Sequence, residues 1–406
     1  MHDIVLISVI VPTYNGGQYL DSCLSALRHC LYVPYEIMVI DNGSVDHSRK
    51  IAHDHGVGIV DCPEPSGPGA ARNQGARYAK GEILLFVDAD VVIQSDALLR
   101  VLAAFQEHED LAAVFGSYDN QPAAQNFISQ YKNLLNHFVH QHSNTEAETF
   151  WGGCGAIRAD VFHRIGGFNE TTYPQASIED IEMGYRLRRA GYRIVLDKDL
   201  QGQHLKEWRF FSLIRTDIFC RAIPWTKLIL ESRNVVNALN LQRSQRVSVG
   251  MVGMAAMVSL LTVVEPSMSL TALPFLFVAL FLNRQLFHFF LRARGFRFAV
   301  AALPLQLLYF FYSGVIFATY WACNCCHTRS ANLYLRLTKW RNFFSRTSVP
   351  KNPLETTLPD GYNLGDGSSA TLSSAPLPAI SSSQTRMGKK LLRPPSKVFS
   401  SGTIPY

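Results

Sequence analysis

Charged residues are scarce in this sequence: Asp, Glu, Lys and Arg make up 17% of its 406 residues, whereas apolar residues make up 48%. So small a charged share is unusual for a wholly soluble enzyme. The deficit lies in residues 247–322, which are largely apolar. We therefore expect three parts: a globular domain over residues 1–230, a membrane region over 231–330, and a basic, Ser- and Pro-rich tail over 331–406 that stays disordered.

The sequence also lacks a secretory signal, an internal repeat and any C-x-x-C pair among the first five of its eight cysteines. The apolar run at 4–11 is short and has no basic leader, so we expect the globular domain in the cytosol with reduced cysteines. The cluster Cys323-Asn324-Cys325-Cys326-His327 does not have the spacing of a usual zinc site, so we interpret it as thiols next to the membrane. The net charge is +6 with arginines around the apolar segments, which favours a membrane surface over nucleic acid as a partner.

Three apolar runs occupy the membrane region, at 247–264, 270–282 and 299–322. The first and third are long enough to cross a bilayer, which takes about 20 helical residues, whereas the second needs its flanking Ser and Thr residues. A buried core helix is the alternative for each run taken alone. Arginines flank the first two runs and are absent from the turn at 265–269, which predicts a hairpin with both ends in the cytosol. Residues 284–298 have the mixture of Arg, Phe and Leu of an interfacial helix. Because the third run conflicts with the charge rule, we expect an integral membrane protein with two or three transmembrane helices.

The globular domain alternates short β-rich runs with helical stretches. Strands are expected at 7–11, 36–40, 57–60 and 83–87. Alternation at this spacing predicts an α/β fold with a mostly parallel central sheet. Polar clusters follow the first, second and fourth of these strands, so they should meet at the edge where open α/β sheets bind ligands.

The strand at 83–87 ends in two aspartates, Asp88 and Asp90. Residues i and i+2 of an extended chain point the same way, so both carboxylates should emerge on one side. Two close carboxylates repel each other unless a cation lies between them, and a divalent ion held by carboxylates and substrate phosphates suits that position. A pair of solvated turn aspartates is the alternative.

Five short motifs give the globular domain a resemblance to a known family. They stand in the order that is typical of family 2 glycosyltransferases: VIVPTYN at 9–15, IDNGSVD at 40–46, GAARNQG at 69–75, FVDAD at 86–90 and EDIEMGYRL at 179–187. These are inverting enzymes of the GT-A fold, and the resemblance covers roughly residues 7–225. One position departs from the pattern, because Asn42 stands where the family often has Asp.

The resemblance implies a nucleotide-sugar donor, with a UDP-sugar favoured over a GDP-sugar. The resemblance implies that six residues bind the nucleotide. They follow the expected strands at 7–11, 36–40 and 83–87 or lie in the expected helix at 69–80: Pro12, Thr13, Tyr14, Asp41, Arg72 and Asp88. Ser44 and Asp46 are either direct contacts or turn formers. Asp90 would hold Mg²⁺ or Mn²⁺, with Asp88 beside it and nearer the sugar. His204 would approach the metal or the diphosphate, and a surface or core histidine is the alternative.

The resemblance also implies a base. Glu179 and Asp180 precede an expected helix, and in the family an aspartate at the position of Asp180 deprotonates the acceptor hydroxyl. Capping of the helix N-terminus by acidic residues is the alternative. Residues 221–225 loosely resemble the Gln/Arg-x-x-Arg-Trp box of processive synthases but differ in spacing, so we expect a single transfer.

The sequence therefore predicts a membrane-bound inverting glycosyltransferase that acts on a hydroxyl group of a lipid-linked or membrane-presented acceptor. A polyprenyl-phosphate glycosyltransferase is one alternative, since an anionic phosphate acceptor needs no base. A non-catalytic membrane scaffold with the same fold is another.

Overall fold

The computed structural model describes residues 5–325, apart from residues 33, 63–65, 233–235, 237–238 and 269. The predicted tail over 331–406 and the end of the cysteine cluster, Cys326 and His327, lie outside the described residues.

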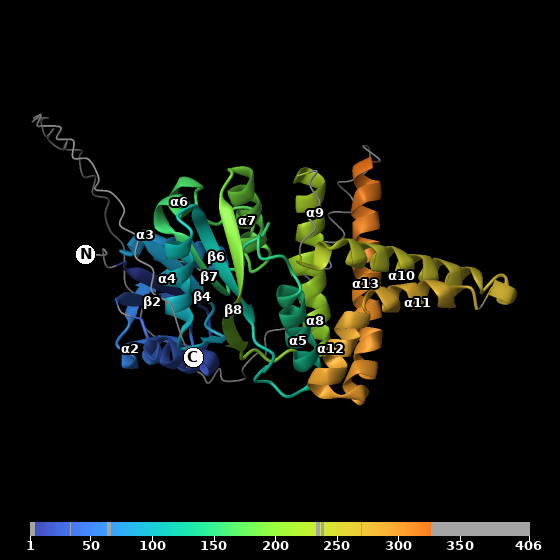
Figure 1. Cartoon of the computed structure of the whole chain (residues 1–406), viewed down its shortest axis with the longest axis horizontal. Coiled ribbons are helices and arrows are strands. Elements are labelled where there is room, and N and C mark those ends of the chain that lie inside the picture. The colour runs from blue at the N-terminus through green and yellow to red at the C-terminus, as the bar shows by residue number, and fades with distance from the viewer. Residues whose placement is uncertain are drawn as a thin grey trace, which may run out of the picture. The chain divides into compact units, whose positions relative to one another are not determined.

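The globular domain is built on an eight-stranded mixed sheet with the strand order β3-β2-β1-β4-β7-β6-β8-β5 (Figure 1). The strands are β1 (Ile7–Thr13), β2 (Tyr35–Asp41), β3 (Gly58–Asp61), β4 (Ile83–Val87), β5 (Val91–Ile93), β6 (Leu111–Tyr118), β7 (Cys154–Arg158) and β8 (Arg193–His204). The predicted α/β class and the four predicted strands are confirmed, and β3, β2, β1 and β4 are parallel as expected. The other half of the sheet is mixed, because β7 runs antiparallel to both of its neighbours and β5 runs antiparallel to β8.

Helices cover both faces of this sheet, and each face has its own apolar core. The helices of the domain are α1 (Gly17–Arg28), α2 (Ser48–Asp54), α3 (Gly67–Tyr78), α4 (Ala97–Glu107), α5 (Phe127–Gln141), α6 (Ala159–Arg164) and α7 (Glu179–Arg189). In β4, Leu85 packs into the core under α1 and α4, whereas Leu84 and Phe86 pack into the core under α3, α6 and α7. Both alternating faces are buried, which explains why the strand reads as a continuous apolar run.

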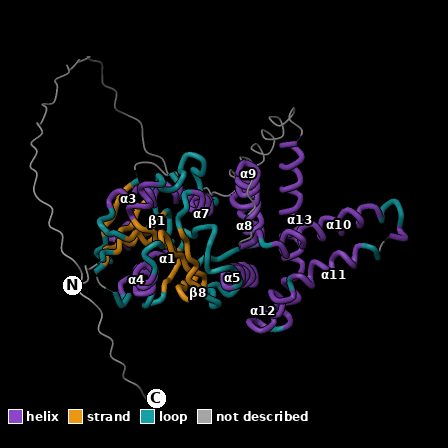
Figure 2. The backbone as a smooth tube through the Cα atoms, turned by 45° about the horizontal axis from the view of Figure 1, so that its top comes forward, coloured by secondary structure: helices purple, strands orange, loops and turns teal. Residues whose placement is uncertain are grey.

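Further helices follow the sheet domain. They are α8 (Phe210–Arg215), the π-helical segment η1 (Thr216–Ala222), α9 (Ile223–Ser232), the short turns η2 (Leu239–Leu241) and η3 (Pro266–Met268), and then α10 (Arg243–Leu261), α11 (Ala272–Leu282), α12 (Arg284–Arg294) and α13 (Phe296–Cys325). By length and composition α10 and α13 could cross a membrane, and α11 and α12, which meet at a bend of 64°, could form one broken span. Figure 2 shows α10 and α11 running side by side.

The predicted interfacial segment is only partly free to face a membrane. Leu286 and Phe290 of α12 are buried in a cluster with Leu134 of α5 and Ala302 of α13. The apolar face of α12 therefore packs onto protein and ties the apolar helices to α5 of the sheet domain.

Candidate active site

A cleft of about 630 Å³ opens where β1 and β4 end. Most of the residues that the sequence singled out line it: Pro12, Tyr14, Arg72, Asp88, Asp90, Glu179, Asp180 and His204. Thr13 and Asp41 are buried and are not among the lining residues. The cleft thus brings Asp180 to the same cavity as Asp88 and Asp90, although the roles expected of them remain predictions.

Arg72 of α3 holds two of the carboxylates in place. Its guanidinium donates to Asp88 Oδ1 at 2.6 Å and to Glu179 Oε1 at 3.0 Å, and the residue is 4% exposed. Burial raises the pKa of Asp88, while Arg72 counteracts this and Asp90 adds to it. Arg72 therefore acts as a buried clamp between the end of β4 and α7.

Asp90 faces His204, the last residue of β8. The Asp90 Oδ2 and His204 Nε2 atoms lie 3.4 Å apart, and His204 Nδ1 lies 2.6 Å from Asn133 Oδ1. With the amide oxygen of Asn133 accepting the Nδ1 proton, Nε2 is the nitrogen turned to Asp90. Burial is the largest single effect and would raise the pKa of Asp90, but His204, Lys206 and a backbone hydrogen bond together outweigh it, so the pKa is lowered.

The residues present suit a cation that shares its ligands with substrate. Among the described residues, no group of three or more His, Cys, Asp or Glu side chains is arranged to hold a metal. Mg²⁺ is usually bound by one or two protein carboxylates and completed by substrate phosphates, so a full protein cage is not required. The pair Asp90 and His204 fits such an ion, whereas Asp88 is already engaged by Arg72.

Asp180 lies in the first turn of α7. Its Oδ2 accepts a hydrogen bond from the Gly152 amide at 3.0 Å, and its Oδ1 accepts one from the Ile181 amide at 2.8 Å. Burial, with a further contribution from Glu179, raises the pKa of Asp180 to about 6. Glu179 is ion-paired with Arg72 and accepts from the Ser177 amide, whereas the two hydrogen bonds to Asp180 come from backbone amides.

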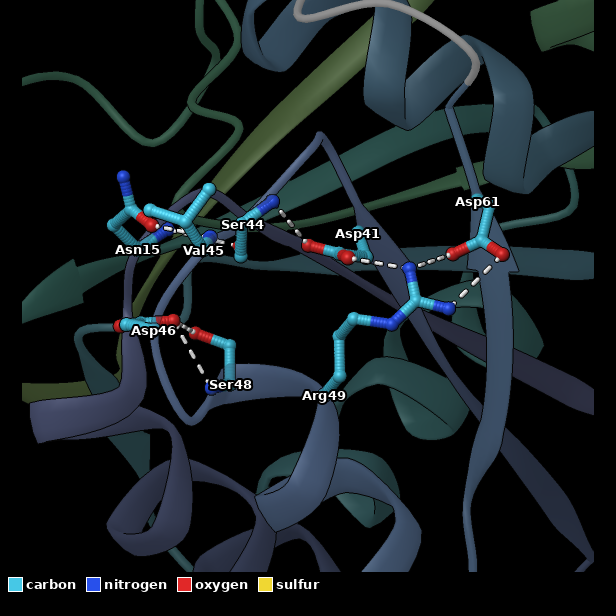
Figure 3. Close-up of polar contacts among 8 residues, drawn as sticks. All are labelled: Asn15, Asp41, Ser44, Val45, Asp46, Ser48, Arg49 and Asp61. Carbon is cyan, nitrogen blue, oxygen red and sulfur yellow. Dashed lines mark hydrogen bonds and ion pairs between the residues drawn. The ribbon is translucent and has the colours of Figure 1, made fainter. Parts of the chain in front are cut away.

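Asp41 is committed to protein contacts at the end of β2 (Figure 3). It is 2% exposed, its Oδ1 accepts from the Ser44 amide at 3.0 Å, and its Oδ2 accepts from Arg49 at 3.0 Å. Arg49 also forms two hydrogen bonds with Asp61 at the end of β3. The carboxylate expected to contact the nucleotide is thus tied to two neighbours in this structure.

Hydrogen bonds join the loop after β2 to the loop after β1. Ser44 and Asp46, which the sequence left as either nucleotide contacts or turn formers, make hydrogen bonds within this region. The Asn15 amide donates to Ser44 Oγ at 2.9 Å, and the Val45 amide donates to Asn15 Oδ1 at 2.9 Å. Asp46 accepts from the amide and the hydroxyl of Ser48. These contacts match the turn-forming interpretation of Ser44 and Asp46.

Several lining residues were missed by the sequence reasoning, among them Lys132 and Trp208. Lys132 is 4% exposed in α5, and its buried neighbours include the polar residues Ser129 and Asn133. No apolar stripe therefore marks this lysine as buried, and a single charge on one helix is too common to stand out without its tertiary partner. Trp208 follows β8 in an irregular segment and carries no periodic pattern.

Comparisons with known proteins agree that the chain is a glycosyltransferase. The model for glycosyl transferase family 2 matches residues 8–166, and that for the N-terminal domain of galactosyltransferase matches residues 132–204. Glycosyltransferase GlyG of Streptococcus pneumoniae serotype 4 is 34% identical over 120 residues, which are 28% of this chain and 40% of that protein. The match thus spans less than half the length of that relative.

Two further proteins are similar over a longer stretch. The O-antigen chain rhamnosyltransferase RfbN of Salmonella typhimurium is 24% identical over 234 residues, which are 54% of this chain and 74% of that protein. The solved structure of mannosyltransferase PcManGT from Pyrobaculum calidifontis, in complex with GDP-Man and Mn²⁺, is 18% identical with a TM-score of 0.47, over 77% of this chain and 86% of that chain. The match to the model of glycosyl transferase family 2 covers residues 8–166, less than half of this chain, and it includes Asp88 and Asp90 of the cleft.

Proposed function

We propose that the protein is a membrane-bound inverting glycosyltransferase of the GT-A fold. It moves a sugar from a nucleotide-diphosphate donor to a hydroxyl group of a lipid-linked or membrane-presented acceptor. The observation that carries the proposal is the meeting of Asp88, Asp90 and Asp180, from β4 and α7, in one cleft. The O-antigen activity in the name of RfbN supports a cell-envelope polysaccharide or glycolipid as the product.

Asp180 is the proposed general base. A base is most effective when its pKa is close to the working pH, and burial brings that of Asp180 to about 6. The Gly152 amide fixes the carboxylate, so the acceptor hydroxyl would meet an oriented oxygen. The hydroxyl oxygen then attacks the anomeric carbon on the side opposite the nucleotide, and the configuration inverts.

Asp90 and His204 are the residues that would hold Mg²⁺ or Mn²⁺. When bound, the ion would neutralise the negative charge that develops on the departing diphosphate. Pro12 and Tyr14 line the cleft beside β1, where they are placed for the nucleotide, and Trp151 offers a ring face for a sugar. A UDP-sugar remains the favoured donor.

The apolar helices support attachment to a membrane. Large apolar side chains of α10 and α11 are exposed, among them Met257 (67%), Leu260 (71%) and Phe277 (69%). Such a surface is unfavourable in water and suits lipid. An acceptor with a lipid tail would reach the cleft along the bilayer surface, with the sheet domain in the cytosol.

The test is a comparison of nucleotide release by wild type and Asp180→Asn in lipid extract, over a panel of UDP- and GDP-sugars. For a hydroxyl acceptor we expect the variant to lose about 10³-fold or more in kcat. Near-normal turnover of the variant would instead favour a phosphate acceptor, which is already anionic.

A separate binding measurement addresses the scaffold alternative. Calorimetry of the full chain with UDP and GDP should show binding that strengthens when Mn²⁺ is added. If neither nucleotide binds with or without the metal, the chain is a scaffold and not a transferase.

A further inference from the structure

A buried charged network adjoins the cleft on the side of the apolar helices. Asp217, in η1, is 5% exposed and accepts hydrogen bonds from three side chains. Lys132 of α5 donates at 3.0 Å, Arg221 of η1 at 2.7 Å, and the Tyr312 hydroxyl of α13 at 2.9 Å. The network therefore joins three elements that are far apart in the sequence.

The charges in this network do not balance. Lys132 and Arg221 share the single carboxylate of Asp217, so one positive charge is in excess. The Lys132 side chain is 5% exposed, and burial together with Arg221 lowers its pKa to about 8, which still leaves it charged at neutral pH. Two cations on one carboxylate leave a net positive charge at the cleft, and an anion that enters beside them is favoured.

The same two cations line the cleft. Lys132 and Arg221 are lining residues, and the Arg221 side chain is 37% exposed, so it has room for a second partner. The Arg221 guanidinium lies over the Trp208 ring, 5.7 Å from its centroid. The indole Nε1 of Trp208 is buried and, within the part of the chain that the structure describes, has no hydrogen-bond partner. The excess positive charge and the unpaired indole N–H beside it both suit an anionic group with oxygen atoms that accept hydrogen bonds.

The position of the network favours the acceptor substrate over the donor. Its anchor Tyr312 belongs to α13, one of the two helices apolar and long enough to cross a membrane. A second buried hydrogen bond, from Tyr131 of α5 to Gln306 of α13, ties the same two helices together. A group held here is therefore next to an apolar helix, where the head of a lipid would lie.

We propose that Lys132 and Arg221 form a subsite for the phosphate or diphosphate group of a lipid-linked acceptor, with Asp217 and Tyr312 as its positioning residues. The inference deepens the proposed function and rests on it. Charge-assisted hydrogen bonds to phosphate from a lysine and an arginine supply the affinity. Asp217 keeps both cations directed at one point, and Tyr312 fixes Asp217 to the helix that borders the lipid.

The test measures binding to the full chain in detergent by calorimetry, with farnesyl phosphate, farnesol and UDP plus Mn²⁺ as probes. Wild type should bind farnesyl phosphate about tenfold or more tightly than farnesol, which corresponds to about 1.4 kcal/mol, since hydrogen bonds to a charged group are stronger than neutral ones. Lys132→Met should lose about tenfold in affinity for farnesyl phosphate, with farnesol and UDP unchanged.

Further variants guard against a folding defect. Arg221→Gln changes a more exposed residue and should shift farnesyl phosphate binding in the same direction. Tyr312→Phe keeps the ring and removes one hydrogen bond, so it should give a smaller loss. Lys50→Met removes an exposed lysine of α2 and should change none of the three affinities.

Two results would overturn the subsite: equal affinity of wild type for farnesyl phosphate and farnesol, or a loss of UDP binding in Lys132→Met and Arg221→Gln as large as the loss of farnesyl phosphate binding. The second result would mean that Lys132 and Arg221 bind the nucleotide donor. If wild type prefers farnesyl phosphate but binds neither UDP nor GDP with Mn²⁺, the phosphate site stands and the proposed transferase function falls.

Discussion

The carboxylates of the cleft differ in their surroundings more than in their chemistry. Asp90 has a lowered pKa because His204, Lys206 and a backbone hydrogen bond together outweigh the effect of burial, so it stays ionised and suits a cation. The pKa of Asp180 is raised to about 6 by burial and by Glu179, so it can accept and release a proton near neutral pH. In many active sites the pKa values of neighbouring acids differ. One acid stays ionised and binds a cation, while the other accepts or donates a proton.

This difference predicts a pH profile. Asp180 acts as a base only when ionised, and a raised pKa means that it keeps its proton until the pH passes about 6. We therefore expect kcat/KM to rise with pH through about 6 and to level off above it. Nucleotide release between about pH 5 and 8 measures this.

Two variants complete that measurement. Asp180→Asn should remove the rise together with most of the activity. Glu107→Gln, at the exposed end of α4, should leave the profile unchanged. A wild-type profile that is flat over the range would speak against Asp180 as the base.

At the scale of elements, α7 depends on one close approach of backbones. Gly184 lies in the middle of this helix, and a Cβ atom there would lie 2.4 Å from the Phe150 amide nitrogen and 2.5 Å from Thr149 Cα. Glycine lowers helix stability by about 1 kcal/mol relative to alanine, so tertiary packing explains its presence. The loop that follows this contact supplies the Gly152 amide that holds Asp180.

Gly184→Ala should therefore destabilise the domain. The backbone atoms that the methyl group meets cannot rotate away as a side chain can, and we expect a loss of about 1–3 kcal/mol or more in the free energy of unfolding. Gly250→Ala in α10 is a matched control, because a Cβ atom there meets nothing within 4 Å. Thermal unfolding in detergent compares the two, and equal stability of Gly184→Ala and wild type would contradict the packing argument.

At the scale of the whole molecule, the helices after the sheet domain expose apolar side chains on one side and bury them on another. The exposed side of α13 carries large apolar residues, among them Phe311 (43% exposed) and Val315 (48% exposed). In α12, by contrast, Phe290 is fully buried against protein. One side of the helices after the sheet domain thus packs against protein. The other side exposes apolar residues, which is unfavourable in water.

This predicts firm membrane attachment of the full chain. It should stay in the membrane pellet after alkaline carbonate extraction and dissolve only in detergent. Phe311→Lys with Val315→Lys should weaken this attachment, since a charged side chain on an apolar face that meets lipid is costly. Release of the wild-type chain by carbonate alone would mean that α10 and α13 do not cross a bilayer.

The sequence by itself determined the features that depend on short spacing. The apolar run 83–87 fixed β4, and the i, i+2 rule placed Asp88 and Asp90 at its end. The 3.6-residue period fixed α1, whose Leu20, Leu24 and Leu27 are all fully buried. These patterns act over a few residues, so the chain segment carries the information alone.

Only the tertiary structure decided which charges meet. Arg72 binds Glu179 across 107 positions of the chain, Arg49 occupies Asp41 from the next helix, and Lys132 and Tyr312 reach Asp217 across 85 and 95 positions. The mixed half of the sheet likewise follows from β7 pairing with strands far from it in the chain. Such pairings depend on how helices and strands pack, because a charge selects its partner by distance in space and burial, and neither is written in the local sequence.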